Sequence, residues 1–289
     1  MNLRSRGSVL LLSLWATAAL AALGIAQATR VSLELKWADR AQEARQAWYL
    51  GWAGVELAAD RLLSDSELAW DAPREVWAQV PKDPVPFESG TFIYRVSDEQ
   101  ARIALNGASK ELLERLPGFT PQAVTELLTR RSAGKFVAHP AELLGLPGFQ
   151  PDGLDTLEPL VTVQGTGPVN INTASKQVLI QLGLSPTLSD AIVRFRNGAD
   201  GVWGTSDDGI FPDVEQIPVI SEQSLGPLIP EDQLALSQLI GSQSLGVRSS
   251  FYRVEVEGRT FRHGIWRKAV AILERSQGQA PVVRGWHEA

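Results

Sequence analysis

The distribution of apolar and charged positions sets the N-terminus apart from the rest of the chain. Residues 8–29 carry no formally charged side chain, and most of them are apolar. As an α-helix, these 22 residues would be about 33 Å long, enough to cross the roughly 30 Å hydrocarbon core of a bilayer. Arg4 and Arg6 precede the run. We therefore expect a transmembrane helix with its N-terminus in the cytoplasm.

A helical pattern continues beyond this run. Small and apolar residues recur at spacings of three and four, and no proline or turn cluster interrupts the chain before Ser64. The members of this stripe are Trp37, Ala41, Ala44, Trp48, Trp52, Val55, Ala59 and Leu62. We predict one helix from near residue 8 to about residue 64, in which 30–64 lies outside the membrane and packs its Trp-rich stripe on a partner.

Three interpretations of the N-terminus differ in where the chain would be cut. A permanent signal anchor is not cut. A secretory signal would be cut after the small-x-small sequence Ala26-Gln27-Ala28. A prepilin leader comprising residues 1–7 would end at Gly7 and leave Ser8 as the new N-terminus. The unbroken helical pattern and the glycine placed directly before the apolar run favour the leader.

A second pattern repeats at an offset of 66 residues. Residues 103–116 (IALNGASKELLERL) and 169–182 (VNINTASKQVLIQL) share an extended entry, an Asn-x-Ala-Ser turn and leucines at helical spacing. The recurring positions are Asn106, Ala108, Ser109, Lys110, Leu113 and Leu116, matched by Asn172, Ala174, Ser175, Lys176, Leu179 and Leu182. Each copy predicts a helix capped by Asn or Ser, a turn, and a second helix ending near Arg130 or Arg196. These are two helix-hairpin-helix-like units.

β-Rich sequence flanks this helical block on both sides. Residues 91–96 are aromatic and β-branched, while 250–257 and 259–274 alternate as a hairpin around a turn at Gly258. We expect an α+β fold in which a small antiparallel sheet covers the second half of the long helix. The expected parts are a body from 65–105 and 245–275, an inserted all-α domain over 106–244, and a flexible tail at 276–289.

An acidic insertion distinguishes the second repeat from the first. Nine extra residues lie within 197–209, where three aspartates stand among four glycines. Crowded carboxylates repel one another unless a cation joins them, and calcium takes six to eight oxygens from carboxylates, hydroxyls and carbonyls. The spacing does not fit an EF-hand, and a solvated loop without an ion is the alternative. The expected calcium ligands are Asp200, Asp207 and Asp208, with Val202, Thr205 and Glu215 as further candidates.

Composition narrows the classes of function. The 289 residues hold 27 Lys+Arg against 33 Asp+Glu, for a net charge of −6, and no cysteine. Without cysteine there is no disulfide, thiolate metal site or cysteine nucleophile. Three scattered histidines and the lack of any Ser-His-Asp arrangement predict a protein that is not an enzyme.

The helix-hairpin-helix units raise the question of nucleic-acid binding. Such binding requires glycine-rich hairpins whose amides face a phosphate, with basic residues nearby. Pro117-Gly118-Phe119-Thr120 has one glycine, and Gly183-Leu184-Ser185 has no second one. We therefore expect no nucleic-acid partner, and a membrane-anchored DNA receptor of the competence type is the alternative function.

The N-terminal layout resembles the type IV pilin class. In that class a prepilin peptidase cuts a short basic leader after a glycine, here Gly7, and methylates the new terminus, here Ser8. Major subunits carry a glutamate at the fifth mature position, where this chain has Leu12. That carboxylate neutralises a neighbour's buried amine, a need that a subunit at the filament tip does not have. Together with the Asn-x-Ala-Ser repeats and the GADGVWGTSDDG loop, the layout resembles the type II secretion system protein K family of minor pseudopilins.

This resemblance implies a fold and a function. The fold would be a pilin-like long helix on a small antiparallel sheet, with the large helical insertion. The protein would be a non-enzymatic, single-pass inner-membrane subunit whose bulk lies in the periplasm. With minor pseudopilins I and J it would form the pseudopilus tip, start assembly and support protein export. The implied partners also include the prepilin peptidase, the major pseudopilin and secreted substrate. The resemblance implies calcium at the acidic loop as well.

Overall fold

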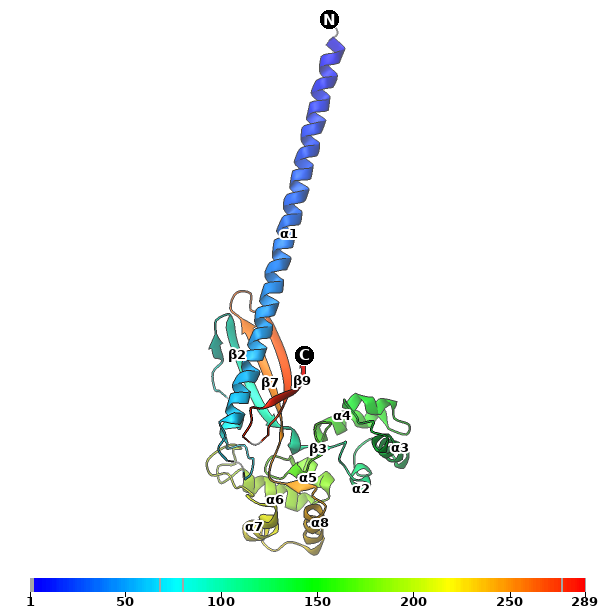
Figure 1. Ribbon diagram of the computed structural model, residues 1–289, viewed down its shortest axis with the longest axis vertical. Coiled ribbons are helices and arrows are strands. Elements are labelled where there is room, and N and C mark those ends of the chain that lie inside the picture. Colours follow the sequence, from blue (N-terminus) through cyan, green and yellow to red (C-terminus); the bar gives the residue numbers. More distant parts are fainter. Residues whose placement is uncertain (1–2, 68, 80, 277, 289) are drawn as a thin grey trace.

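A computed structural model describes residues 3–67, 69–79, 81–276 and 278–288, with side chains from residue 9 onward except that of residue 225. One helix, α1 (Leu3–Leu63), runs through more than half of the molecule's length (Figure 1). Its first half projects alone, and its second half packs on the body. The single unbroken helix predicted from the sequence is confirmed.

The projecting half of α1 has no protein around it. Every side chain over residues 9–38 is exposed. In the described part of the chain this is the one helix long and apolar enough to cross a membrane. The sheet meets α1 only from Asp39 onward, so Trp37, which we predicted to be part of the buried stripe, is 72% exposed.

Five antiparallel strands cover the second half of α1. They are β1 (Val85–Phe87), β2 (Gly90–Asp98), β7 (Phe251–Thr260), β8 (Trp266–Glu274) and β9 (Val282–Glu288). The order in the sheet is β1-β2-β7-β8-β9. The β2–β7 pairing extends from Gly90 opposite Thr260 to Asp98 opposite Tyr252. The sheet is therefore assembled from both ends of the chain, as expected.

Two glycines let α1 lie close against the sheet. A Cβ at Gly54 would collide with the methyl groups of Val256, and one at Gly258 would lie 2.8 Å from Leu50 Cβ. Gly258 is therefore needed inside β7, and the predicted turn at this residue was wrong. The turn between β7 and β8 lies at residues 261–265.

The helix face that meets the sheet is rotated from the predicted stripe. The fully buried positions of α1 include Ala47, Leu50 and Ala58. Trp48 and Trp52 stand beside this face, 38% and 37% exposed. A tryptophan side chain is too large to fit where the two glycines bring the backbones together, so the rings pack at the margin of the interface.

The last strand was not predicted. Residues 282–288 form β9 and pair with β8, so the expected flexible tail is wrong for this segment. The Trp286 ring lies 5.3 Å from that of Trp52 and 6.0 Å from that of Trp48, centroid to centroid. Aromatic contacts at these distances stabilise beyond the area they bury. The tail is thus fixed by contacts with α1, more than 200 residues away in sequence.

The insertion contains both predicted repeats. In each, a serine hydroxyl caps the first helix at 3.2 Å, Ser109 on Leu112 N and Ser175 on Val178 N, as expected. The first repeat and its continuation contain α2 (Lys110–Leu113), α3 (Pro121–Ser132) and α4 (Leu154–Leu157), with 3-10 turns at η3 (Pro140–Gly145), η4 (Pro151–Gly153) and η5 (Glu158–Leu160). The second contains α5 (Lys176–Leu182), α6 (Pro186–Arg196), η6 (Val214–Gln216), α7 (Ile217–Leu225) and α8 (Pro230–Gly241).

The insertion is not entirely helical, which corrects the all-α expectation. Two short parallel strand pairs form where the chain enters and leaves each repeat. They are β3 (Ile103–Ala104) with β4 (Val161–Thr162), and β5 (Val169–Asn170) with β6 (Leu245–Gly246). Each pair holds together the two ends of one repeat. Two further 3-10 turns, η1 (Val76–Ala78) and η2 (Glu99–Ala101), belong to the connections with the body.

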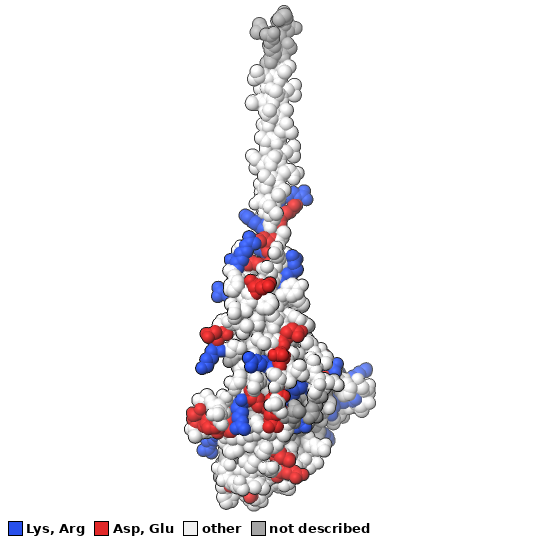
Figure 2. Space-filling model, turned by 60° about the vertical axis from the view of Figure 1, so that its left-hand side comes forward, with Lys and Arg blue, Asp and Glu red and all other residues white. Residues whose placement is uncertain are grey.

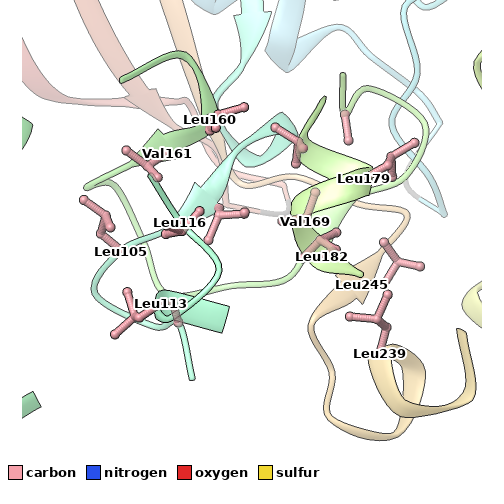
Figure 3. Packing of buried hydrophobic residues seen from close by; sticks show 14 of the residues in the cluster. Leu105, Leu113, Leu116, Leu160, Val161, Val169, Leu179, Leu182, Leu239 and Leu245 are labelled. Atoms are coloured by element: carbon pink, nitrogen blue, oxygen red, sulfur yellow. The ribbon is translucent and has the colours of Figure 1, made fainter. Parts of the chain in front are cut away.

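The recurring asparagines close each repeat. Asn106 bonds both the carbonyl and the amide of Val137, at 2.9 and 3.0 Å, and Asn172 does the same to Phe211, at 3.0 and 2.9 Å. The recurring leucines form one core shared by both units. Figure 3 shows Leu113 and Leu116 of the first repeat on one side of this core, and Leu179 and Leu182 of the second on the other. The repeat is therefore a packing unit.

Candidate metal centre and buried junction

The acidic loop at 197–209 leaves the end of α6 and returns to it. Gly198 N and Gly209 N both donate to Phe195 O, at 3.3 and 3.1 Å. Gly198 has a φ of 63°, which L-residues rarely adopt. Its left-handed backbone turns the chain at the start of the loop. Because these two hydrogen bonds join its ends, the loop has a defined structure.

Most of the predicted calcium ligands converge inside this loop. Thr205 Oγ1 lies 2.6 Å from Asp207 Oδ1, 3.2 Å from Asp208 Oδ1 and 3.2 Å from Val202 O. Two carboxylates, a hydroxyl and a carbonyl therefore share one small volume. Such oxygens are the ligands that calcium prefers.

The other two candidate ligands lie differently. Asp200 Oδ1 accepts from Val202 N at 2.7 Å, and Asp200 N donates to Asp207 Oδ2 at 3.2 Å, so Asp200 flanks the group. Glu215 lies in η6, where its amide bonds Asp213 Oδ1 at 3.1 Å. Among the described contacts, its carboxylate makes none with the loop. The structure brings together Val202, Thr205, Asp207 and Asp208, and leaves Glu215 outside the group.

The hydrogen bonds of the loop favour an ionised Asp207. The Thr205 hydroxyl and the amides of Asp200 and Ala199 lower the pKa of Asp207. Asp208 is 6% exposed and accepts from Gly204 N at 2.8 Å. The residues of the loop thus fit a calcium ion in donor chemistry, and the lowered pKa of Asp207 agrees with this.

A second polar cluster joins the insertion to the body, and the sequence did not reveal it. Asp98, at the end of β2, is 5% exposed. Its Oδ2 accepts from Thr173 Oγ1 at 2.5 Å, Ser249 Oγ at 2.6 Å and Asn170 Nδ2 at 3.1 Å. Burial raises the pKa of Asp98 to about 6. One carboxylate therefore ties both strands that flank the insertion to its second repeat.

Asp71 extends this cluster toward α1. It accepts from Ser249 N and from Tyr252 OH, both at 2.7 Å, and pairs with Arg275. Arg275 also binds Asp65 at 2.9 Å. These residues are separated by up to 210 positions, so no local sequence pattern marks them.

Glu75 is the least satisfied member of the cluster. Its Oε2 accepts from Ala72 N at 2.7 Å and from Trp77 Nε1 at 2.9 Å, whereas Oε1 has no partner among the described residues. One oxygen from each of Asp65, Asp71 and Glu75 lies within 4.8 Å of the others. Burial, with added repulsion from the two aspartates, raises the pKa of Glu75 to about 8. Glu75 therefore holds a proton at neutral pH.

This architecture is similar to that of a solved structure. It is a chain from the crystal structure of the GspK-GspI-GspJ complex of the enterotoxigenic Escherichia coli type 2 secretion system, with a TM-score of 0.62 and 18% sequence identity. The match covers 86% of this chain and 98% of that chain. No protein-family model matches, and no curated protein does.

The match defines the class of fold. The long helix, the antiparallel sheet and the inserted helical region together form a pseudopilin fold. The architecture is similar to that of a chain in the GspK-GspI-GspJ complex structure, which confirms the expected long helix on an antiparallel sheet with a helical insertion. Gly7 and Ser8 lie in α1, but their side chains are outside the described ones. Leu12 is 69% exposed on the projecting half of α1.

The protonated Glu75 predicts a pH-dependent stability. Its folded pKa of about 8 lies above the 4.5 of an ordinary glutamate. The folded state retains a proton that the unfolded chain has lost, so the free energy of unfolding should fall as pH rises from about 4.5 to about 8. Glu75→Gln should reduce this fall and be more stable than wild type at pH 8, on the order of a few kcal/mol.

Urea unfolding in detergent at pH 5 and pH 8 measures the effect. Glu56→Gln, on an exposed position of α1, is the control and should follow wild type at both pH values. Equal pH slopes for Glu75→Gln and wild type would contradict the assignment.

Proposed function

We propose that this protein is a K-type minor pseudopilin of a type II secretion system, with no enzymatic role. The observation that carries the proposal is a pseudopilin fold bearing a large helical insertion, matched over 86% of the chain. The apolar segment at 8–29 anchors the protein in the bacterial inner membrane. The N-terminus is cytoplasmic, and the body and insertion lie in the periplasm.

The position of the insertion supports a place at the tip of the pseudopilus. In Figure 1 the insertion lies at the end of the body farthest from the projecting half of α1. A subunit stacked on that end of the body would collide with the insertion. Leu12 supports the same position at the tip, because a terminal subunit needs no carboxylate at this residue to neutralise the buried amine of a neighbour. The protein starts pseudopilus assembly from this position and supports export across the outer membrane.

Its partners are the I and J minor pseudopilins of its own system. The similar solved chain belongs to a complex with GspI and GspJ. The prepilin peptidase, the major pseudopilin and secreted substrate are further proposed partners.

The packing of the hairpin argues against the alternative of a DNA receptor. A Cβ on Gly118 would lie 2.7 Å from Phe149 Cζ. Gly118 O accepts from Gln150 N at 2.8 Å, and the Phe119 and Phe149 rings are 5.3 Å apart. The hairpin is thus packed against a second turn of its own repeat. A hairpin that binds DNA must present its amides to a phosphate.

Co-purification tests this function. The full-length chain, tagged and co-expressed with the I and J minor pseudopilins of the same organism, should be extracted with both in a stoichiometric complex. The same preparation should pass through a DNA column at low salt. Retention on DNA together with failure to bind I and J would replace the pseudopilin function with the DNA-receptor alternative.

We also propose that the prepilin peptidase cuts after Gly7 and that Ser8 becomes the methylated N-terminus. The basic leader and the adjoining apolar run support this processing. Intact-mass measurement of the protein extracted from membranes should give a chain that begins at Ser8, with one added methyl group. A chain beginning at Thr29 would show instead that a secretory signal had been removed.

We propose that the acidic loop binds calcium through Asp207, Asp208, Thr205 and the carbonyl of Val202, with Asp200 adjacent. The ion would neutralise the crowded carboxylates and fix the loop against the body. Two contacts already join the loop to the residues on either side of η1. Arg74 Nη1 donates to Asp208 O, and Gln79 Nε2 donates to Gly204 O, both at 3.3 Å.

Calcium should raise the melting temperature of the wild-type protein. A ligand at 100 times its dissociation constant stabilises by about 2.7 kcal/mol. Asp207→Asn combined with Asp208→Asn should abolish this gain and change stability much less in chelator. Asp213→Asn, just outside the loop, is the matched control and should keep the gain. If the double variant lost a similar amount of stability with and without calcium, the aspartates would act only through their hydrogen bonds.

A further inference from the structure

The end of the body nearest the projecting half of α1 is formed by the β7–β8 turn (Figure 1). This turn is held on α1 by polar contacts. Arg262 pairs with Asp39, while His263 N and Nδ1 lie 2.8 and 2.5 Å from the two carboxylate oxygens of Glu43. Glu43 is only 1% exposed. The turn therefore has a fixed position along the helix.

That position is close to the expected bilayer surface. Asp39 lies ten residues beyond Thr29, which is about 15 Å along the helix axis. The headgroup layer extends roughly 5–7 Å beyond the hydrocarbon core on each side. Arginine and aromatic side chains from the turn can span most of the remaining distance.

A groove connects the turn with the membrane-spanning part of α1. It is lined by Gln27, Ala28, Val31, Ser32, Leu35, Lys36, Asp39 and Arg262. Its part nearest the span, around Ala28 and Val31, is apolar and begins within the predicted span. Its end nearest the body carries the two cations Lys36 and Arg262, of which Arg262 pairs with Asp39. The groove thus changes from apolar to basic in the same direction as a lipid changes from acyl chain to phosphate.

Exposed aromatic side chains stand at the same end of the body, in and next to the β7–β8 turn and in α1 just before Asp39. Trp37, Phe261 and Trp266 are 72%, 65% and 54% exposed. Aromatic residues of this kind are enriched where proteins meet the membrane–water interface. Together with Lys36 and Arg262 they form a surface that we call the rim.

The charge around the rim is positive. Figure 2 shows a band of charged side chains where the uncharged part of α1 ends. In the structure as described, Glu34 pairs with Arg30, Asp39 with Arg262 and Glu43 with His263. Four described cations in this region, Lys36, Arg40, Arg259 and Arg267, have no carboxylate within 4.0 Å. The acids without a cationic partner are Glu88 and Glu257, joined by Glu43 when His263 is neutral, so cations remain in excess. An excess of cations near a bilayer is attracted to anionic headgroups.

We propose that the rim rests on the phospholipid headgroups of the bilayer in which α1 is embedded. Lys36 and Arg262 bind lipid phosphates at the end of the groove nearest the body, and the rings of Trp37, Phe261 and Trp266 lie among the headgroups. The body thereby gains a second membrane contact and a fixed orientation before it joins any assembly. The inference depends on α1 spanning a membrane and does not depend on the proposed place in a pseudopilus.

Cysteine labelling can test this contact, because the chain has no cysteine of its own. The full chain carrying Ser89→Cys is labelled with a fluorophore and reconstituted in vesicles of phosphatidylethanolamine and phosphatidylglycerol. Ser89 lies beside the turn, since its carbonyl accepts from Phe261 N at 3.1 Å. Lipids with a quencher near the headgroup should quench this label several-fold more than a label at Leu234→Cys. Leu234, in α8 of the insertion, is 60% exposed.

A label at Leu20→Cys, within the span, controls for insertion and should be quenched by lipids carrying the quencher deep in the acyl chain. Equal quenching at Ser89→Cys and Leu234→Cys, in vesicles where Leu20→Cys is quenched, would overturn the proposal. Failure to quench Leu20→Cys would overturn the membrane anchor on which the inference rests.

Two variants separate lipid binding from simple docking of the turn on α1. Lys36→Gln with Arg262→Gln removes the cations, and should lower the quenching at Ser89→Cys toward the Leu234→Cys level. Asp39→Asn also breaks the ion pair between Arg262 and Asp39 but keeps both cations, and should leave the quenching at Ser89→Cys unchanged or higher. An equal loss of quenching in both variants would show that the ion pair alone positions the turn, and would overturn the lipid contact. Replacing phosphatidylglycerol with phosphatidylcholine should weaken quenching in the parent and not in the double variant.

Discussion

Two buried aspartates allow one chain to carry both a pilin-like body and a large insertion. The insertion leaves the sheet after Asp98 and returns at Ser249, and these two residues are joined by a hydrogen bond of 2.6 Å. Asp71 binds the amide of Ser249 and the hydroxyl of Tyr252 from the other side. Because entry and exit meet at one point, the sheet tolerates about 150 inserted residues without opening. Removing either carboxylate would leave several buried donors unpaired.

Beyond this junction, the insertion depends on the same asparagine contact in each of its two repeats. Asn106 and Asn172 each close a repeat by pairing with one residue far along it. The leucines then merge the two closed units into one core. The helix-hairpin-helix pattern serves packing, and this explains why its hairpin is turned inward against Phe149 instead of toward a phosphate. The acidic loop is an addition to the second unit, and Arg74 and Gln79 connect it to the body.

The features predicted correctly from sequence depend on local periodicity. The long helix and the capping serines Ser109 and Ser175 follow from local residue spacing, and the two repeats follow from matching segments at an offset of 66. The errors concern contacts between distant segments. Gly258 looked like a turn because the sequence does not show that Leu50 must pack on it. Trp286 packs β9 on Trp48 and Trp52, which are more than 200 residues away in sequence. Glu215 stays a prediction as a ligand: it lies in η6, and its carboxylate makes no contact with the loop among the described residues.

Continuity of α1 connects the two ends of the molecule. The same helix projects through residues 9–38 and then forms the centre of the body, with no described break between Leu3 and Leu63. At Gly54 it lies too close to the sheet for even one added methyl group. Arg275 then joins the sheet to Asp65, just past the end of α1, and to Asp71 at the junction. Helix, sheet and insertion are linked in series by buried contacts, so displacement of the helix along its axis must move the insertion with it.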